Sequence, residues 1–135
     1  MKEHMIFRAG SMHRNIAYWV TTAIVVFELG LGGAWDILRV PQVGELMERL
    51  GYPTYFLVIL GIWKLLGIIA LVAPGFPRLK EWAYARVIFD LSGAVASLSA
   101  AGLASVGTTA YPVVMIGVAV ASWALRPSSR RLGVD

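Results

Sequence analysis

Lys64 is the residue of this chain that is least compatible with its surroundings. It lies in the middle of residues 54–72, a stretch of nineteen residues that carries no other charge. A helix of this length spans about 30 Å, which is the thickness of the hydrocarbon core of a bilayer. A lone ammonium near the midplane costs about 2.5 kcal/mol or more. The sequence must therefore supply a partner for Lys64, and other charges do lie within apolar stretches.

Glu28 is the first candidate partner. It lies ten residues before residue 38, where its apolar stretch ends, and Lys64 lies ten residues after residue 54, where the next one begins. Adjacent antiparallel helices with aligned ends would bring both residues to the same depth. The spacing therefore predicts a Glu28–Lys64 ion pair. Asp36 lies two turns beyond Glu28, and we expect it to pair with Arg39 or to remain hydrated.

Arg86 and Asp90 form a second candidate pair. Their i, i+4 spacing places them on one face of a helix, where opposite charges attract. The formal charges of these two residues and of Glu28 and Lys64 sum to zero, as expected of one polar cluster.

This cluster has two interpretations. In the first, its ion pairs only fix how the helices pack. In the second, it lines a ligand pocket or a proton path at the midplane, because charges inside a membrane are functional candidates. Lys64 and Arg86 would then donate to a carbonyl oxygen of the ligand. The carboxylates, Glu28 and Asp90, would hold these cations and relay protons, and Trp63 would stack on a ring.

The composition indicates the class of protein that carries these charges. Hydrophobic residues make up 58% of the 135 residues and charged residues only 15%, which is typical of a membrane protein. The absence of cysteine excludes disulfides and thiolate metal sites. His4 and His13 have no third ligand nearby, so we expect no metal site. The basic residues flank apolar stretches, which argues against a nucleic-acid partner.

Four apolar stretches predict an all-α, integral membrane four-helix bundle formed by a single domain, residues 1–135. The expected spans are residues 16–38, 54–72, 82–102 and 108–125. Residues 40–52 are too polar to span, and Val43, Leu46, Met47 and Leu50 recur there at helical spacing. We expect a short amphipathic helix on the outer surface between the first two spans. A simple surface connector is the favoured interpretation of this helix, and a lid is the alternative.

The distribution of basic residues orients the chain. Eight of them lie before the first span, between the second and third, or after the fourth, whereas the opposite side carries only Arg39 and Arg49. The positive-inside rule then places both termini in the cytoplasm. We therefore expect a multi-pass protein of the inner membrane.

One segment resembles a known family. The string LKEWAYARVIFDLSGAVAS closely resembles the third-span signature of the DoxX-like family of small bacterial membrane proteins. The string LGIWKLLGIIALVAPGFPRLKEWAY extends the match back through the second span, and LGYP is similar to the family's entry to that span. The resemblance covers about residues 18–126, is continuous over residues 60–97, and implies a four-helix membrane bundle.

The resemblance also implies a setting for function. Relatives in the wider DoxX group are associated with quinone-linked sulfur oxidation and with membrane oxidoreductase assemblies. Lys64, Glu81, Trp82 and Asp90 match residues typical of this branch. The chain departs from the pattern at Arg86, where relatives often have a small residue, commonly glycine. It also has Leu98 where many relatives carry a histidine.

The favoured hypothesis is a small accessory protein or subunit of membrane redox or stress metabolism. It would bind a quinone-like or other amphiphilic molecule between its helices. The chain has no self-contained catalytic motif, so oxidoreductase chemistry would need a partner or a loosely held cofactor such as a quinone. The alternative is a small transporter or a non-enzymatic scaffold whose ion pairs are structural. The expected partners are the bilayer and either a second copy of the chain or a membrane redox protein.

Overall fold

The computed structural model describes residues 2–133, except the side chains of His4 and Phe7. This part of the chain contains five α-helices and a short 3-10 helix, and no strand. The helices are α1 (Lys2–Ile37), α2 (Pro41–Leu50), α3 (Tyr55–Val72), α4 (Pro77–Ala100) and α5 (Val106–Leu125), and the 3-10 helix is Ser128–Arg130. The predicted all-α class is therefore confirmed, and α2 is the short helix expected between the first two spans.

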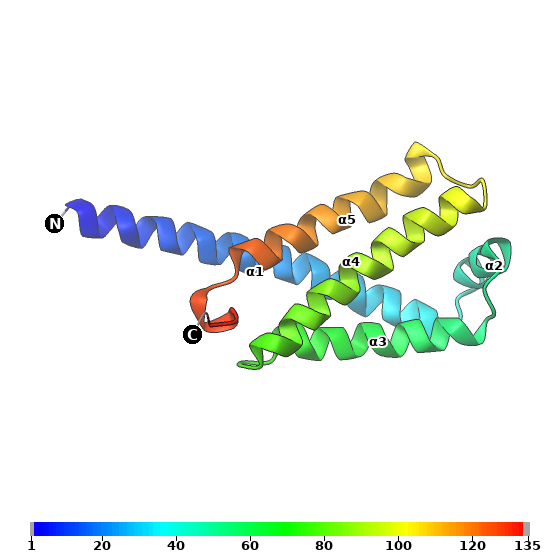
Figure 1. Ribbon diagram of the computed structural model, residues 1–135, viewed down its shortest axis with the longest axis horizontal. Coiled ribbons are helices and arrows are strands. Elements are labelled where there is room, and N and C mark those ends of the chain that lie inside the picture. Colours follow the sequence, from blue (N-terminus) through cyan, green and yellow to red (C-terminus); the bar gives the residue numbers. More distant parts are fainter. Residues whose placement is uncertain (1, 134–135) are drawn as a thin grey trace.

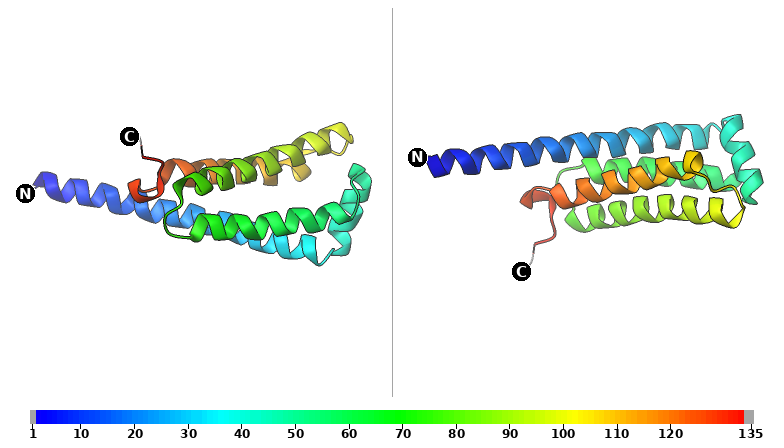
Figure 2. Two further views of the ribbon diagram at one scale, coloured as in Figure 1. Left: turned by 60° about the horizontal axis from the view of Figure 1, so that its bottom comes forward. Right: turned by 90° about the horizontal axis from the view of Figure 1, so that it is seen from above.

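The four long helices form a bundle in which each has two neighbours. α1 packs closely against α3 and α5, and α4 packs closely against α5, whereas the contact between α3 and α4 is sparser. Figures 1 and 2 show that α3 and α4 leave their connecting turn together and diverge toward α2. The first part of α1 projects beyond the bundle, and both ends of the chain lie at the end opposite α2 (Figure 1).

Three of the described helices are long and apolar enough to cross a membrane. They comprise Arg8–Ile37 within α1, Tyr55–Val72 and Val106–Leu125. α4 is longer than the last two, with 24 residues, but Arg78, Lys80, Glu81, Arg86 and Asp90 make it more polar. α1 begins well before residue 16, where the first span was expected to start, because no proline interrupts residues 2–15.

The hydrophobic core joins all four long helices. Val25 and Leu29 of α1 pack there against Leu71 of α3, Val87 of α4 and Ala119 of α5. These side chains are almost completely inaccessible. Many large apolar side chains elsewhere on the helices, such as Phe27, Ile69 and Phe89, are instead exposed, as expected of helices in lipid.

Buried hydroxyl groups link α1, α4 and α5 beside this core. The Oγ atom of Ser122 lies 2.7 Å from Thr22 Oγ1 and 2.7 Å from Tyr84 Oη. All three side chains are buried. Polar groups in apolar surroundings need hydrogen-bond partners, so this chain of hydroxyls helps to select which faces of the three helices meet.

α1 and α3 approach closely where Gly33 faces Gly61. A Cβ atom on Gly61 would lie 2.8 Å from the Gly33 carbonyl oxygen and 2.6 Å from Ile37 Cγ1. A Cβ atom on Gly33 would lie 3.3 Å from the Gly61 carbonyl oxygen. Small residues allow such close approach of membrane helices. This glycine pair therefore sets the register between α1 and α3.

A buried lysine holds the end of the bundle that carries the α3–α4 turn. Lys80 is 0% exposed, and its ammonium donates to the carbonyl oxygens of Ala70 at 3.1 Å, of Gly75 at 2.7 Å, and of Ala73. The Ala70 carbonyl lies in the last turn of α3, where carbonyls lack intrahelical donors, and those of Ala73 and Gly75 lie in the turn that follows. Burial, and next the charge of Arg130, lower the pKa of the Lys80 ammonium. A residue that the sequence indicates only as a topology signal thus also caps α3.

A second basic residue ties α4 to α5 at the same end. Arg126 binds the Glu81 carboxylate, and its guanidinium lies 5.4 Å from the Tyr84 ring centroid and 5.2 Å from that of Trp123. Trp123 Nε1 donates to the other Glu81 oxygen at 2.9 Å. Burial alone raises the pKa of the Glu81 carboxyl, but the hydrogen bonds from Trp123 and Arg126 outweigh it and keep that pKa below its usual value.

The glycine crossing leads to a first prediction. Gly61→Ala should lower the free energy of unfolding by about 1–3 kcal/mol, because the new methyl group overpacks the crossing. Gly117→Ala is the matched control, since nothing lies within 4 Å of a Cβ atom at that exposed position of α5. Thermal unfolding in detergent, followed by circular dichroism, measures both. Equal stability of the two variants would contradict the close crossing.

A second prediction concerns the lysine cap. Lys80→Met should destabilise the protein, because each buried carbonyl left without a donor costs about 1–3 kcal/mol. Arg78→Met removes a positive charge two residues earlier from an exposed position, and we expect no change in stability. The same thermal unfolding experiment compares them. If both variants lost equal stability, the effect would come from net charge and not from capping.

Candidate functional site

A cleft of about 760 Å³ lies between α3 and α4, and α2 covers one end of it. Most of its lining is apolar, and its polar side chains include the Arg86–Asp90 ion pair on α4 and the hydroxyls of Tyr52 and Ser97. The main lining residues are Leu46, Met47 and Leu50 of α2, Phe56, Ile59, Leu60 and Trp63 of α3, and Trp82, Arg86, Phe89, Asp90, Gly93 and Ser97 of α4. A Cβ atom on Gly93 would meet nothing within 4 Å, so this glycine widens the cleft.

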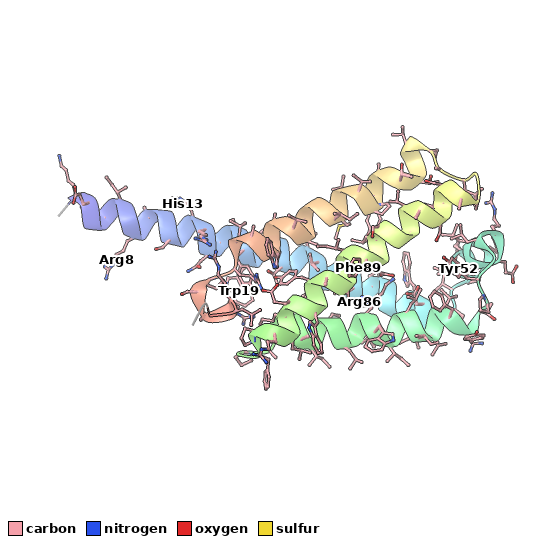
Figure 3. All side chains as sticks on the ribbon, in the orientation of Figure 1. Arg8, His13, Trp19, Tyr52, Arg86 and Phe89 are labelled. Atoms are coloured by element: carbon pink, nitrogen blue, oxygen red, sulfur yellow. The ribbon has the colours of Figure 1, made fainter. Side chains whose placement is uncertain are left out.

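Arg86 supplies the polar centre of the cleft. Its Nη2 atom lies 3.5 Å from Asp90 Oδ2 and 3.5 Å from the carbonyl oxygen of Leu60 on α3. The predicted Arg86–Asp90 pair is therefore present. The Nη1 atom of Arg86 is buried and has no hydrogen-bond partner among the described residues. Figure 3 shows this side chain in the space between α4 and α3. Arg86 thus lines the cleft and carries one buried donor that has no acceptor among the described residues.

Large aromatic side chains mark the open side of the cleft. Trp82 is 74% exposed, Phe89 is 73% exposed and Trp63 is 54% exposed, although all three line the cleft. In a membrane protein such exposed apolar side chains face the acyl chains. The open side of the cleft is therefore bordered by exposed aromatic side chains of α3 and α4.

The end of the cleft near α2 is closed by a polar contact. Tyr52 Oη lies 2.8 Å from Ser97 Oγ, and the Tyr52 ring stacks on Phe56 with centroids 5.3 Å apart. Residues with positive φ flank α2, namely Arg39 at 50° and Gly51 at 80°. The apolar side chains of α2 line the cleft, although none of its residues is buried. α2 therefore contributes to the wall of the cleft as well as connecting α1 to α3.

The predicted Glu28–Lys64 ion pair is wrong. Lys64 Nζ lies 2.8 Å from Asp36 Oδ2, and Asp36 is buried. Glu28 makes no ion pair within the described part of the chain. It stays in the neighbourhood, because a Cβ atom on Gly32 would lie 3.2 Å from Lys64 Nζ and 3.7 Å from Glu28 Oε1. Asp36 therefore neither pairs with Arg39 nor remains hydrated.

The register between α1 and α3 explains this change of partner. The prediction assumed that the two helices end at the same level. In the structure, Gly33 contacts Gly61 and Lys64, which shifts α1 along α3 by about one helical turn. With Gly32 beside the ammonium, Glu28 and Asp36 each lie one turn away along α1, and Lys64 pairs with Asp36.

The structure thus divides the predicted cluster into two parts. Arg86, Asp90 and Trp63 line the cleft, whereas Lys64 and Glu28 are not among its lining residues. The sequence did not indicate Tyr52 and Phe89 as parts of the site. Phe89 precedes Asp90 on the same helix, but nothing in the sequence indicates which aromatic residues face a partner helix.

Metal ligands are not grouped in the described residues. No set of three or more histidine, cysteine, aspartate or glutamate side chains could hold a metal ion there. The arrangement can instead bind a molecule through one cationic donor, one flanking carboxylate and an extensive apolar surface.

The partner of Lys64 gives a third prediction. Asp36→Asn should cost about 3–5 kcal/mol of unfolding free energy, because it leaves a buried ammonium without its counter-ion. Glu28→Gln should cost less, since Glu28 has no direct contact with Lys64. The double variant Asp36→Asn, Lys64→Met should recover most of the loss. A larger loss for Glu28→Gln than for Asp36→Asn would reverse the assignment.

Comparison with known proteins identifies one family. A model of the DoxX-like family matches residues 20–122, which include α3, α4 and most of α5. No curated protein and no solved structure matches the chain.

Proposed function

The chain belongs to the DoxX-like family of membrane proteins, and we propose that its α2–α3–α4 cleft binds a quinone-like or other amphiphilic small molecule. The protein would serve as an accessory protein or subunit of membrane redox or stress metabolism. The observation that carries this proposal is the buried, unpartnered Nη1 donor of Arg86 in an otherwise apolar cleft. Ligand sites are typically apolar cavities with a few polar groups that fix orientation.

The topology belongs to the same proposal. We place four spans in the inner membrane, with both termini in the cytoplasm and residues 1–135 as one domain. α4 serves as the fourth span despite its charges. Its Arg86 and Asp90 pair with each other, while exposed positions carry apolar residues such as Trp82 and Phe89. Such an arrangement keeps charge away from lipid.

The residues of the cleft have distinct roles toward a bound quinone. Arg86 Nη1 donates to a carbonyl oxygen, and Asp90 holds the guanidinium in place. Trp63 offers an aromatic face beside the ring. A bound quinone would supply reversible two-electron chemistry, which this chain would support by binding and orienting it, together with a redox partner protein or a second copy of the chain.

Glu28 and Lys64 keep a supporting role in the proposal. The Lys64–Asp36 pair fixes α3 against α1, and Glu28 lies behind the cleft beside it. They shape the site through α3 and do not contact the ligand.

The scaffold alternative also has an observation in its favour. Both cations of the cluster already have a carboxylate partner, as expected if ion pairs only organise the helices. The experiment must therefore separate a ligand site from a structural pair.

The fourth prediction compares small molecules that co-purify with three forms of the protein. In the first variant, Arg86→Met and Asp90→Asn remove the ion pair of the cleft together and leave no unpaired charge. The matched control, Lys64→Met with Asp36→Asn, removes the other ion pair outside the cleft. Mass spectrometry should find a quinone or lipid-like species with the native protein and with the control, and at least tenfold less with the first variant.

Two outcomes would contradict the proposal. If the native protein retains no specific molecule, the ligand site fails. If both folded double variants retain the same amount as the native protein, the charges are structural and the scaffold alternative is supported.

A further inference from the structure

We infer that the cleft selects an electrically neutral, membrane-dissolved molecule with a hydrogen-bond-accepting oxygen in its head, and that it rejects anionic lipids such as fatty acids. This inference rests on the proposed function, because it names the ligand class of the same cleft. Three features of the structure support it, namely the open donor, the sum of the central charges and the shape of the apolar surface.

The open donor requires an acceptor. Nη2 of Arg86 is directed to Asp90 and to the carbonyl oxygen of Leu60, whereas Nη1 is buried without a partner among the described residues. A buried donor without a partner costs free energy, and an acceptor oxygen of a ligand would remove that cost. Both a carbonyl and a carboxylate provide such an oxygen, so this feature alone does not select between them.

The central charges decide between these two acceptors. Within the described part of the bundle, the central carboxylates are Glu28, Asp36 and Asp90, and the central cations are Lys64 and Arg86. Counted at their formal charges, these five groups sum to −1. Asp90 lines the cleft and already neutralises Arg86. A carboxylate or phosphate head would add a second negative charge beside Asp90, in surroundings where water cannot screen it. A neutral carbonyl head accepts the same hydrogen bond without that repulsion.

The shape of the cleft indicates the rest of the molecule. The lining runs along α4 from Trp82 to Leu98, which corresponds to roughly 24 Å of helix. Apart from Arg86 and Asp90 it is almost entirely apolar, and its open side lies between exposed aromatic residues. Beyond Gly93, Tyr52 and Ser97 satisfy each other and close the end near α2. The ligand is therefore a molecule with a polar head at Arg86 and an apolar body or tail along α4.

The fifth prediction tests this selection by direct competition. The full-length protein is placed in nanodiscs of zwitterionic lipid at an alkaline pH, where membrane-bound palmitate is ionised, and is exposed to equimolar decylubiquinone, which is neutral, and palmitate, which is then anionic. Both molecules retained after gel filtration are quantified by mass spectrometry and compared with empty nanodiscs. We expect the protein to enrich decylubiquinone over palmitate at least tenfold.

Variants identify charge as the cause of the selection. Asp90→Asn removes one negative charge from the cleft with little change of shape, and should shift the ratio toward palmitate at least tenfold. Glu28→Gln removes a charge behind the cleft and should shift it in the same direction, but less. Glu45→Gln on the exposed part of α2 is the matched control and should leave the ratio unchanged.

The outcomes separate this inference from the proposed function. Enrichment of palmitate by the native protein would overturn selection for a neutral head but would support a ligand site in the cleft. An unchanged ratio in both Asp90→Asn and Glu28→Gln would overturn charge as the cause. Retention of neither probe would count against the proposed function itself.

Discussion

The contact between Gly33 of α1 and Gly61 of α3 is the constraint on which the rest of the structure depends. It sets the register of the two helices, and this register brings Lys64 to Asp36. One side of α3 therefore packs against α1. Its other side, which carries Leu60 and Trp63, is left to face α4 and becomes a wall of the cleft.

The cleft exists because α3 and α4 are held together at their connecting turn and less closely along the rest of their length. Lys80 of α4 binds the Ala70 carbonyl in the last turn of α3 and the Gly75 carbonyl in the connecting turn. Toward α2, the link between the helices includes the Arg86–Leu60 contact and the Tyr52–Ser97 hydrogen bond. The helices can therefore diverge there, and the space between them is lined by side chains of α2 (Figure 2).

Charges in this apolar protein organise its packing. Lys80 and Arg126 belong to the basic residues that predict topology, yet both are buried and hold helix ends together. Arg86 pairs with Asp90 but keeps one donor unused.

The sequence by itself determined the all-α class, the family, the short helix α2 and the Arg86–Asp90 pair. These features depend on apolar runs and on i, i+4 spacing, which are local properties of the chain. Only the tertiary structure decided the partner of Lys64, the burial of Lys80 and the cleft itself. The partner of Lys64 depends on a shift of one turn between two helices, and hydrophobicity does not encode that shift, because every register buries similar apolar surface. It depends instead on where two glycines allow backbones to meet. The cleft likewise results from the divergence of α3 and α4, which brings Tyr52, Trp63 and Phe89 around Arg86 from distant parts of the chain.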